Sequence, residues 1–302
     1  MSLAEKLPYY HPFAQGFPGI GSQRVPVDSD ILSFANASGA IQVVDLVKLE
    51  NLVAYLKSQS LWDYARFYPM KSAQNAGSGS TVYGLGGLTS NNMTLVNSPT
   101  WGSDGVTFNG STQYGTAETS DLSSHGEILL LLRSSPTSAS SPDVNAHIRC
   151  GIGGIQSAAP AATLTGYTFG FTTASFSGET VASFITAEGD TSISKITGSS
   201  GVTWTAGEDH IIGYQFGDAT VFYKNKTGYA PDKNIGVTPS TPLGPSDLGG
   251  DVSDFFVAGQ QVNGSPTASP SPGVVSTYFV IAGETALTTT QREAITDLIN
   301  AL

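Results

Sequence analysis

Short runs in which bulky residues occupy every second position limit the fold more than any other feature of the sequence. Residues 167–171 and residues 210–216 both show this spacing, which is typical of β-strands with one buried face. The apolar run at residues 127–132 is typical of a strand covered on both faces. Asn109 and Gly110 form a dipeptide typical of a β-hairpin between two further strands. We therefore predict an all-β chain with two packed sheets.

Two helices are predicted outside the strands. Between residues 43 and 59, apolar residues recur three and four positions apart, at Leu46, Leu49, Leu52, Val53 and Leu56. Near the C-terminus, Thr290 and Glu293 fit a capping box at the start of a short helix. The apolar face of that helix consists of Ala294, Ile295, Leu298 and Ile299.

The first 42 residues show neither helical nor strand spacing and contain several prolines, so we predict an extended N-terminal arm. An amphipathic helix with an aromatic end follows over residues 43–70, and the β-sandwich occupies residues 71–302. Aromatic side chains in an arm need a surface to pack on, either a partner subunit or the arm's own domain. The candidate partner contacts are Tyr9, Tyr10, Phe13, Phe17 and Phe34.

Charge and cysteine content exclude several classes of function. The formal net charge is -11, so the chain offers no basic surface for nucleic acid or anionic membranes. No apolar run is long enough to insert into a membrane, and we expect no signal peptide. Cys150 is the only cysteine, which excludes an intrachain disulfide.

Three acidic residues are candidate metal ligands. Asp247, Asp251 and Asp254 recur in a glycine-containing segment, and calcium binds to oxygen ligands on adaptable backbone of this kind. The spacing fits no EF-hand, so the alternative is a solvated acidic loop without a cofactor.

Three stretches resemble, in this order, the concanavalin-like, laminin-G-type jelly-roll domains. Residues 105–114 resemble the opening strands, residues 210–225 the paired strands before a Tyr-x-Asn-Gly turn, and residues 283–292 the closing strand with its helix. Lys226 stands where that turn usually has glycine. The resemblance implies a jelly-roll β-sandwich over roughly residues 100–302.

Residues 61–70 resemble the lead-in of tailed-phage virion proteins. This second resemblance implies a structural protein on the virion surface, made in the bacterial cytoplasm. It would be a capsid decoration or head-fibre component, bound to capsid or tail subunits through its arm, and a homo-oligomer with a trimer as our expectation. The alternative is an adhesin of a tail fibre that recognises host surface glycans.

A third alternative is an enzyme that degrades polysaccharides. Glucanases on this fold use the pattern Glu-x-Asp-x-x-Glu to bring carboxylates together. Glu188 and Asp190 begin that pattern, but Ile193 stands where its last glutamate should be. We therefore predict no catalytic residues and no enzyme activity.

Overall fold

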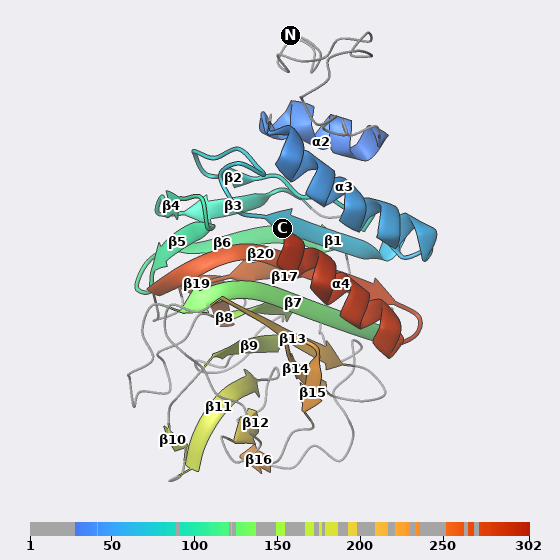
Figure 1. Cartoon of the computed structure of the whole chain (residues 1–302). Coiled ribbons are helices and arrows are strands. Elements are labelled where there is room, and N and C mark those ends of the chain that lie inside the picture. Colours follow the sequence, from blue (N-terminus) through green and yellow to red (C-terminus); the bar gives the residue numbers. More distant parts are fainter. Residues whose placement is uncertain are drawn as a thin grey trace, which may run out of the picture.

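The computed structural model describes residues 28–40, 42–88, 91–120, 122, 125–136, 149–154, 167–171, 175–176, 179–186, 193–197, 209–216, 221–229, 233–235, 252–262, 265–268 and 272–302. In these residues the strands form two large sheets and one small sheet, with antiparallel pairing throughout. Helices cover one face of the first large sheet (Figure 1).

The first large sheet has eight strands, with β7 and β20 at its centre. Its order is β15 (Thr227–Tyr229), β14 (Val221–Lys224), β13 (His210–Phe216), β7 (Glu127–Pro136), β20 (Pro272–Gly283), β5 (Val106–Asn109) and β4 (Thr100–Trp101). The eighth strand, β1 (Ala65–Pro69), also pairs with β20. From the sequence, residues 65–69 are predicted to belong to the aromatic end of the helical segment 43–70. That prediction is wrong, because residues 65–69 pair antiparallel with β20 and are a strand of the sheet, with most of their side chains buried.

The second large sheet has ten strands among the described residues. Its order is β16 (Lys233–Ile235), β12 (Ile193–Thr197), β11 (Glu179–Thr186), β9 (Tyr167–Phe171), β8 (Arg149–Gly154), β17 (Val252–Val257), β6 (Tyr114–Ser120), β3 (Met93–Val96) and β2 (Thr81–Val82), with β10 (Ser175–Phe176) paired to β11. The small sheet pairs β18 (Gly259–Val262) with β19 (Ser265–Ala268). The two large antiparallel sheets, with a shared core between them, make the β-sandwich that the sequence predicts.

The predicted hairpin at Asn109 is wrong, because β5 and β6 lie in different sheets. The side chain of Asn109 explains the difference. Its Oδ1 accepts hydrogen bonds from the backbone N–H groups of Ser111, Thr112 and Gln113, at 3.0 to 3.2 Å. These bonds form a wider loop that carries the chain from one sheet to the other.

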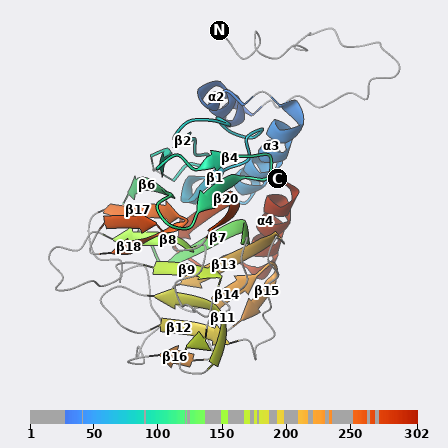
Figure 2. The ribbon, with the colours of Figure 1, turned by 90° about the vertical axis from the view of Figure 1, so that its left-hand side faces the viewer.

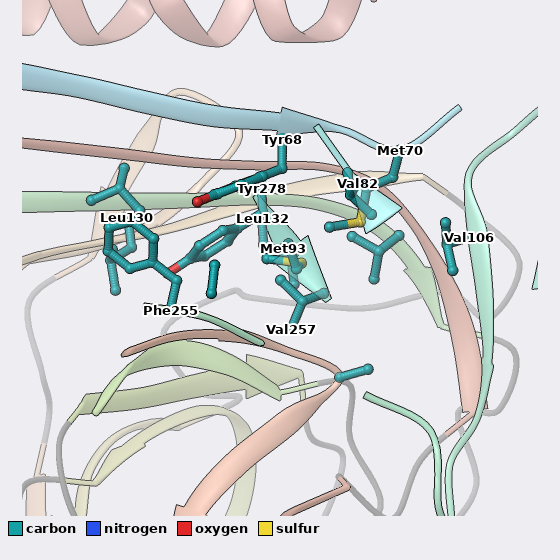
Figure 3. Packing of buried hydrophobic residues seen from close by; sticks show 14 of the residues in the cluster. Tyr68, Met70, Val82, Met93, Val106, Leu130, Leu132, Phe255, Val257 and Tyr278 are labelled. Carbon is teal, nitrogen blue, oxygen red and sulfur yellow. The ribbon is translucent and has the colours of Figure 1, made fainter. Parts of the chain in front are cut away.

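Apolar side chains from both large sheets form an inter-sheet core. Its members include Tyr68, Met93, Val106, Phe108, Ile128, Leu130, Leu132, Phe255, Val257, Tyr278 and Val280. The rings of Tyr68, Phe255 and Tyr278 meet at its centre (Figure 3), with centroids 5.9 to 6.3 Å apart. Aromatic pairs at this separation contribute about 0.5–1.5 kcal/mol beyond the area that they bury.

The outer face of the eight-stranded sheet is covered by α3 (Val43–Ser58) and α4 (Thr289–Ala301), as Figure 2 shows from the side. The bounds of α3 confirm the predicted amphipathic helix. The helix-side core under these helices consists mainly of Leu46, Leu49, Leu52, Val53, Leu56, Phe67, Leu129, Leu131, Phe279, Ile281, Ile295 and Ile299. Because β7 faces both cores, its apolar run is covered on two sides, as predicted.

An additional helix, α2 (Ser29–Ser38), packs on α3. Asp28 caps it by accepting the Asp30 backbone N–H and binds the Lys57 ammonium on α3 at 2.7 Å. Phe34 lies in α2, only 5% exposed, within the helix-side core. The predicted extended arm is therefore wrong for residues 29–38, and Phe34 is wrong as a partner contact, because it is buried inside its own chain.

No helix in the described part of the chain is long and apolar enough to cross a membrane.

Candidate functional site

A cavity of about 330 Å³ opens at one end of the helix-side layer. It lies where α3 ends and where β20 leads into α4. These ends of the two helices are toward the right-hand edge of Figure 1. Its lining residues are Gln59, Ser60, Leu61, Tyr64, Glu127, Ile128, Leu129, Gln215, Ile281, Gly283, Glu284, Thr285, Ala286, Leu287 and Gln291. Its volume falls within the range of about 300–1,000 Å³ that is typical of ligand pockets.

The wall on the α3 side is made by the turn that ends this helix. The Leu61 N–H donates to the Leu56 carbonyl, and the Ser60 N–H donates to the Lys57 carbonyl. This pattern is a Schellman motif, in which the residue after the cap is left-handed and usually glycine. Ser60 occupies that position with φ 57°. A serine hydroxyl is therefore kept in the pocket wall at a position where glycine would fit the backbone better.

The wall on the α4 side is made by the first turn of that helix. Thr288 is the N-cap, and it forms a capping box with Gln291, whose side chain lines the pocket. The predicted box of Thr290 and Glu293 is wrong by two residues. Both pairs have a threonine followed by a suitable side chain three positions later, so the sequence pattern cannot choose between them.

A chain of buried polar side chains crosses the sheet under α4 and reaches the pocket. Arg292, on α4, donates from Nη1 to the Tyr223 hydroxyl at 3.2 Å, and its guanidinium lies 4.1 Å from the centre of that ring. The Tyr223 hydroxyl donates to Gln215 Oε1 at 3.2 Å. Gln215 Nε2 donates to Glu127 Oε2 at 3.3 Å. The side chains of Gln215 and Glu127 both line the pocket.

Burial raises the pKa of the Tyr223 phenol, although the nearby Arg292 guanidinium acts in the opposite direction. The hydroxyl therefore keeps its proton and donates it to Gln215 in the physiological range. With its carbonyl oxygen engaged by Tyr223, the Gln215 amide directs its NH₂ group toward Glu127.

Tyr64 gives the pocket an aromatic rim. It follows α3 in the short 3-10 helix η1 (Trp62–Tyr64), and it is 38% exposed, whereas most other large hydrophobic side chains of the described residues are covered. The ring of His125 meets that of Tyr64 edge-on, with centroids 6.4 Å apart. The Tyr64 ring therefore has an aromatic neighbour on one side and remains accessible to solvent.

Most of the remaining residues singled out from the sequence lie in parts of the chain that the structure does not describe. Tyr9, Tyr10, Phe13 and Phe17 lie outside the described residues, as do Asp247, Asp251, Glu188 and Asp190. Asp254 lies in β17, so this member of the acidic set belongs to a strand of the ten-stranded sheet. No group of three or more metal-binding side chains occurs among the residues whose positions are described.

Sequence reasoning missed the residues that build the pocket. Glu127 and Gln215 lie on different strands, 88 residues apart, and only the pairing of β7 with β13 brings them together. A signal for Glu127 is present, because it is a charged residue at the start of an apolar run. A signal for Arg292 is also present, since it precedes the apolar face of the terminal helix.

The turn with Lys226 keeps its shape without glycine. Asn225 adopts φ 53° there and accepts the Ile211 backbone N–H through Oδ1. The Lys226 ammonium binds the Asp297 carboxylate on α4 at 2.6 Å. This departure from the jelly-roll pattern therefore contributes a contact that holds α4 against the sheet.

Comparisons with known proteins concern the fold. No protein-family model matches the chain, and no curated protein matches it. The chain resembles the Trypanosoma rangeli sialidase in complex with sialic acid, at 12% identity and a TM-score of 0.40, over 85% of this chain and 40% of the sialidase.

Two further solved structures also resemble the chain at low sequence identity. Domain 4 of AbnA, a GH43 extracellular arabinanase from Geobacillus stearothermophilus in complex with arabinotriose, is 14% identical, with a TM-score of 0.38 over 77% of this chain and 87% of that domain. The binding domain of botulinum neurotoxin serotype D is 6% identical, with a TM-score of 0.46 over 79% of this chain and 52% of that structure.

Proposed function

We propose that this protein is a non-enzymatic carbohydrate-binding protein whose ligand occupies the pocket between α3 and α4. The observation that carries the proposal is the combination, in one cavity, of an accessible aromatic ring with fixed hydrogen-bonding side chains. Tyr64 supplies the ring, and Glu127 and Gln215 supply the polar groups.

This combination suits sugars because a sugar ring has both an apolar C–H face and polar hydroxyl groups. The C–H groups on one face of a sugar ring pack on an aromatic ring, while its hydroxyl groups donate to and accept from carboxylates and amides. Gln59, Gln215 and Gln291 give the pocket three amides beside its carboxylates. The carbonyl oxygens of Gln215 and Gln291 already accept hydrogen bonds from Tyr223 and Thr288, so these two amides present mainly their NH₂ groups as donors to a ligand.

The proposal is tested by binding of the full chain to a glycan array, followed by calorimetry on the glycan that binds best. Tyr64→Ala is expected to reduce affinity on the order of tenfold, whereas Tyr64→Phe keeps the ring and the affinity. An array without any bound glycan overturns the proposal, as does a Tyr64→Ala variant that binds as tightly as the unchanged chain.

The proposal assigns no chemistry to the pocket. Glu284 lines it together with Glu127, so two carboxylates are present, as the third hypothesis of the sequence analysis requires. Glu127, however, is only 7% exposed and is hydrogen-bonded to Gln215. Release of reducing ends from the bound glycan, abolished in Glu127→Gln, would contradict a non-enzymatic role.

Attachment to a phage particle is a second proposal, compatible with the first. The observation that favours it is the anchoring of α2. The ion pair between Asp28 and Lys57 holds the start of α2 against α3, so the aromatic-rich residues 1–27 are joined to the domain at a fixed point. In this proposal those residues bind a capsid or tail subunit and the pocket recognises host glycans. A chain lacking residues 1–27 is then expected to lose co-sedimentation with particles while still binding the glycan; unchanged co-sedimentation contradicts the role of the segment.

A further inference from the structure

Gln291 presents a hydrogen-bond donor to the pocket because its carbonyl oxygen is already engaged. That oxygen, Oε1, accepts hydrogen bonds from the Thr288 backbone N–H and from the Thr288 hydroxyl, both at 3.0 Å. A backbone N–H can only donate, so this contact also identifies which end of the amide is the carbonyl. The Gln291 NH₂ group takes part in no hydrogen bond among the described residues, and the side chain lines the cavity.

Gln215 is oriented in the same sense from another element. Its carbonyl oxygen accepts from the Tyr223 hydroxyl, and its NH₂ group donates to Glu127. An NH₂ group has two hydrogens, so one remains for a further acceptor. The cavity thus receives amide donors from α4 and from β13, each held by contacts on its carbonyl side.

Apolar side chains lie in the same lining. Leu61 follows α3 and Leu287 precedes α4, and both are half-buried against the helix-side core. Ile281, from β20, is 4% exposed and also lines the cavity. A methyl group that reaches these side chains leaves water, which favours binding.

An acetamido group matches the donors and the apolar walls together. Its carbonyl oxygen accepts hydrogen bonds, and its methyl group is apolar. A hydroxyl group at the same ring position can accept but has no methyl group, and a protonated amine can only donate. The cavity volume of about 330 Å³ lies at the small end of the range for ligand pockets, as suits one substituted sugar ring.

We infer that the pocket selects sugars that carry an N-acetyl group. In the complex, the acetyl carbonyl accepts a hydrogen bond from the Gln291 NH₂ group, and the acetyl methyl packs on Leu61 and Leu287. This inference rests on the proposed carbohydrate-binding function and adds the substituent that the pocket recognises. At fixed ring stereochemistry, the N-acetyl sugar should bind more tightly than its hydroxyl and amine counterparts.

The test uses the full chain and six methyl glycosides: those of N-acetylglucosamine, glucose and glucosamine, and the corresponding galactose series. Ligand-observed NMR gives the affinities, and saturation transfer shows which ligand protons contact the protein. Within the series that binds, the N-acetyl sugar is expected to bind about tenfold more tightly than either counterpart, with strong saturation of its acetyl methyl protons. An acetyl methyl group without saturation overturns the inference.

Gln291→Glu removes the donor and keeps the cap. A glutamate can accept the Thr288 N–H as glutamine does, so α4 should remain folded. The NH₂ group is lost, and the affinity ratio of the N-acetyl sugar to its hydroxyl counterpart is expected to fall several-fold. Both ligands are neutral, so the added charge alone should not change this ratio.

Gln42→Glu is the matched control, because it adds the same charge at the exposed N-cap of α3, outside the pocket lining. It should leave the ratio unchanged. If Gln291→Glu fails to fold, Leu287→Ala carries the same test, since it removes an apolar contact of the acetyl methyl group. A ratio that responds to neither pocket variant overturns the inference.

The outcomes separate this inference from the function on which it rests. Failure of all six glycosides, together with a blank glycan array, overturns carbohydrate binding and the inference with it. A hydroxyl or amine counterpart that binds as tightly as the N-acetyl sugar overturns the acetyl selectivity alone.

Discussion

The two faces of the eight-stranded sheet differ in the kind of side chain that they bury. The inter-sheet core meets the second sheet with apolar and aromatic side chains. The helix-side layer contains, beside its apolar residues, the buried polar chain from Arg292 to Glu127 and the cavity at its end. Buried polar groups lower stability unless they are fully paired. They also supply oriented hydrogen-bonding groups and charges that can select a ligand. The inter-sheet face therefore contributes mainly to stability, and we propose that the helix-covered face contributes recognition.

The largest expected effect is on stability alone. Phe255→Ala removes a fully buried ring that contacts Tyr68 and Tyr278 in the inter-sheet core. It is expected to lower the free energy of unfolding by about 3–5 kcal/mol, measured by urea denaturation. The folded fraction should bind the glycan with unchanged affinity. A large loss of affinity in molecules shown to be folded would contradict the division between the two faces.

A smaller change should affect both properties. Tyr223→Phe removes the hydroxyl that joins Arg292 to Gln215, and both partners then lose a buried hydrogen bond. We expect a loss of about 1–3 kcal/mol in unfolding free energy and weaker glycan binding, because the Gln215 amide is no longer held in one orientation. Tyr83→Phe, at a partly buried tyrosine outside the chain and the pocket, serves as the control. Unchanged binding in Tyr223→Phe would show that the polar chain does not position the site.

The start of α4 distinguishes the observed cap from the predicted one. Thr288→Ala removes the capping hydroxyl and is expected to lower stability by about 1 kcal/mol, with a shift in the Gln291 side-chain amide resonances. Thr290→Ala, in the exposed first turn of the same helix, should change stability by only a few tenths of a kcal/mol. Equal losses from the two variants would mean that Thr288 is not the cap.

Ser60→Gly should move stability and binding in opposite directions. Glycine adopts the left-handed backbone of this position more easily, so the variant is expected to gain up to about 1 kcal/mol. Affinity for the glycan should fall, because the pocket loses a hydroxyl group. The measurement is thermal unfolding together with calorimetry. A variant that gains stability without losing affinity would remove Ser60 from the site.

The smallest effect concerns the attachment of α2. Burial alone would raise the pKa of the Asp28 carboxyl, but hydrogen bonds from Lys57 and from the Asp30 backbone outweigh it and lower the pKa below 3.8. A lowered carboxyl pKa stabilises the folded state above the ordinary value and loses this contribution as the pH falls through the folded pKa.

Hydrogen exchange of the α2 amides is therefore expected to accelerate as the pH falls from about 5 to below 3.8, after correction for the intrinsic exchange rate. Lys57→Met, which removes the ion pair, should show fast exchange at both ends of this range. An α2 helix that is equally protected at both ends in the unchanged chain would contradict the role of the pair.

The elements that were predicted best from the sequence are those whose residue spacing repeats over a short stretch of chain. The apolar spacing that gives α3 and the run that gives β7 depend on near neighbours, and both elements occur where they were expected. The helix α2 was missed because only Val27 separates its cap, Asp28, from Pro26, the last proline of the stretch that dominates the pattern. Asp28 is a residue type that commonly caps helices, but Lys57, the residue that pairs with it and anchors α2, lies 29 residues away.

The pocket could not be predicted for the same physical reason. Glu127, Gln215 and Tyr64 come from three elements that meet only through sheet pairing and helix packing. Strand register sets which residues of β7 and β13 face the helices, and a shift by one residue would turn Glu127 into the inter-sheet core. The sequence shows the charge at the start of the strand, and the structure shows which face it is on.

The most direct test is hydrogen–deuterium exchange of the full chain with and without the glycan selected on the array. Protection on binding is expected to concentrate at residues 59–64, 127–129 and 283–291, the segments that contain most of the pocket lining. Protection confined to strands of the ten-stranded sheet, with these three segments unchanged, would contradict the claim that recognition belongs to the helix-covered face.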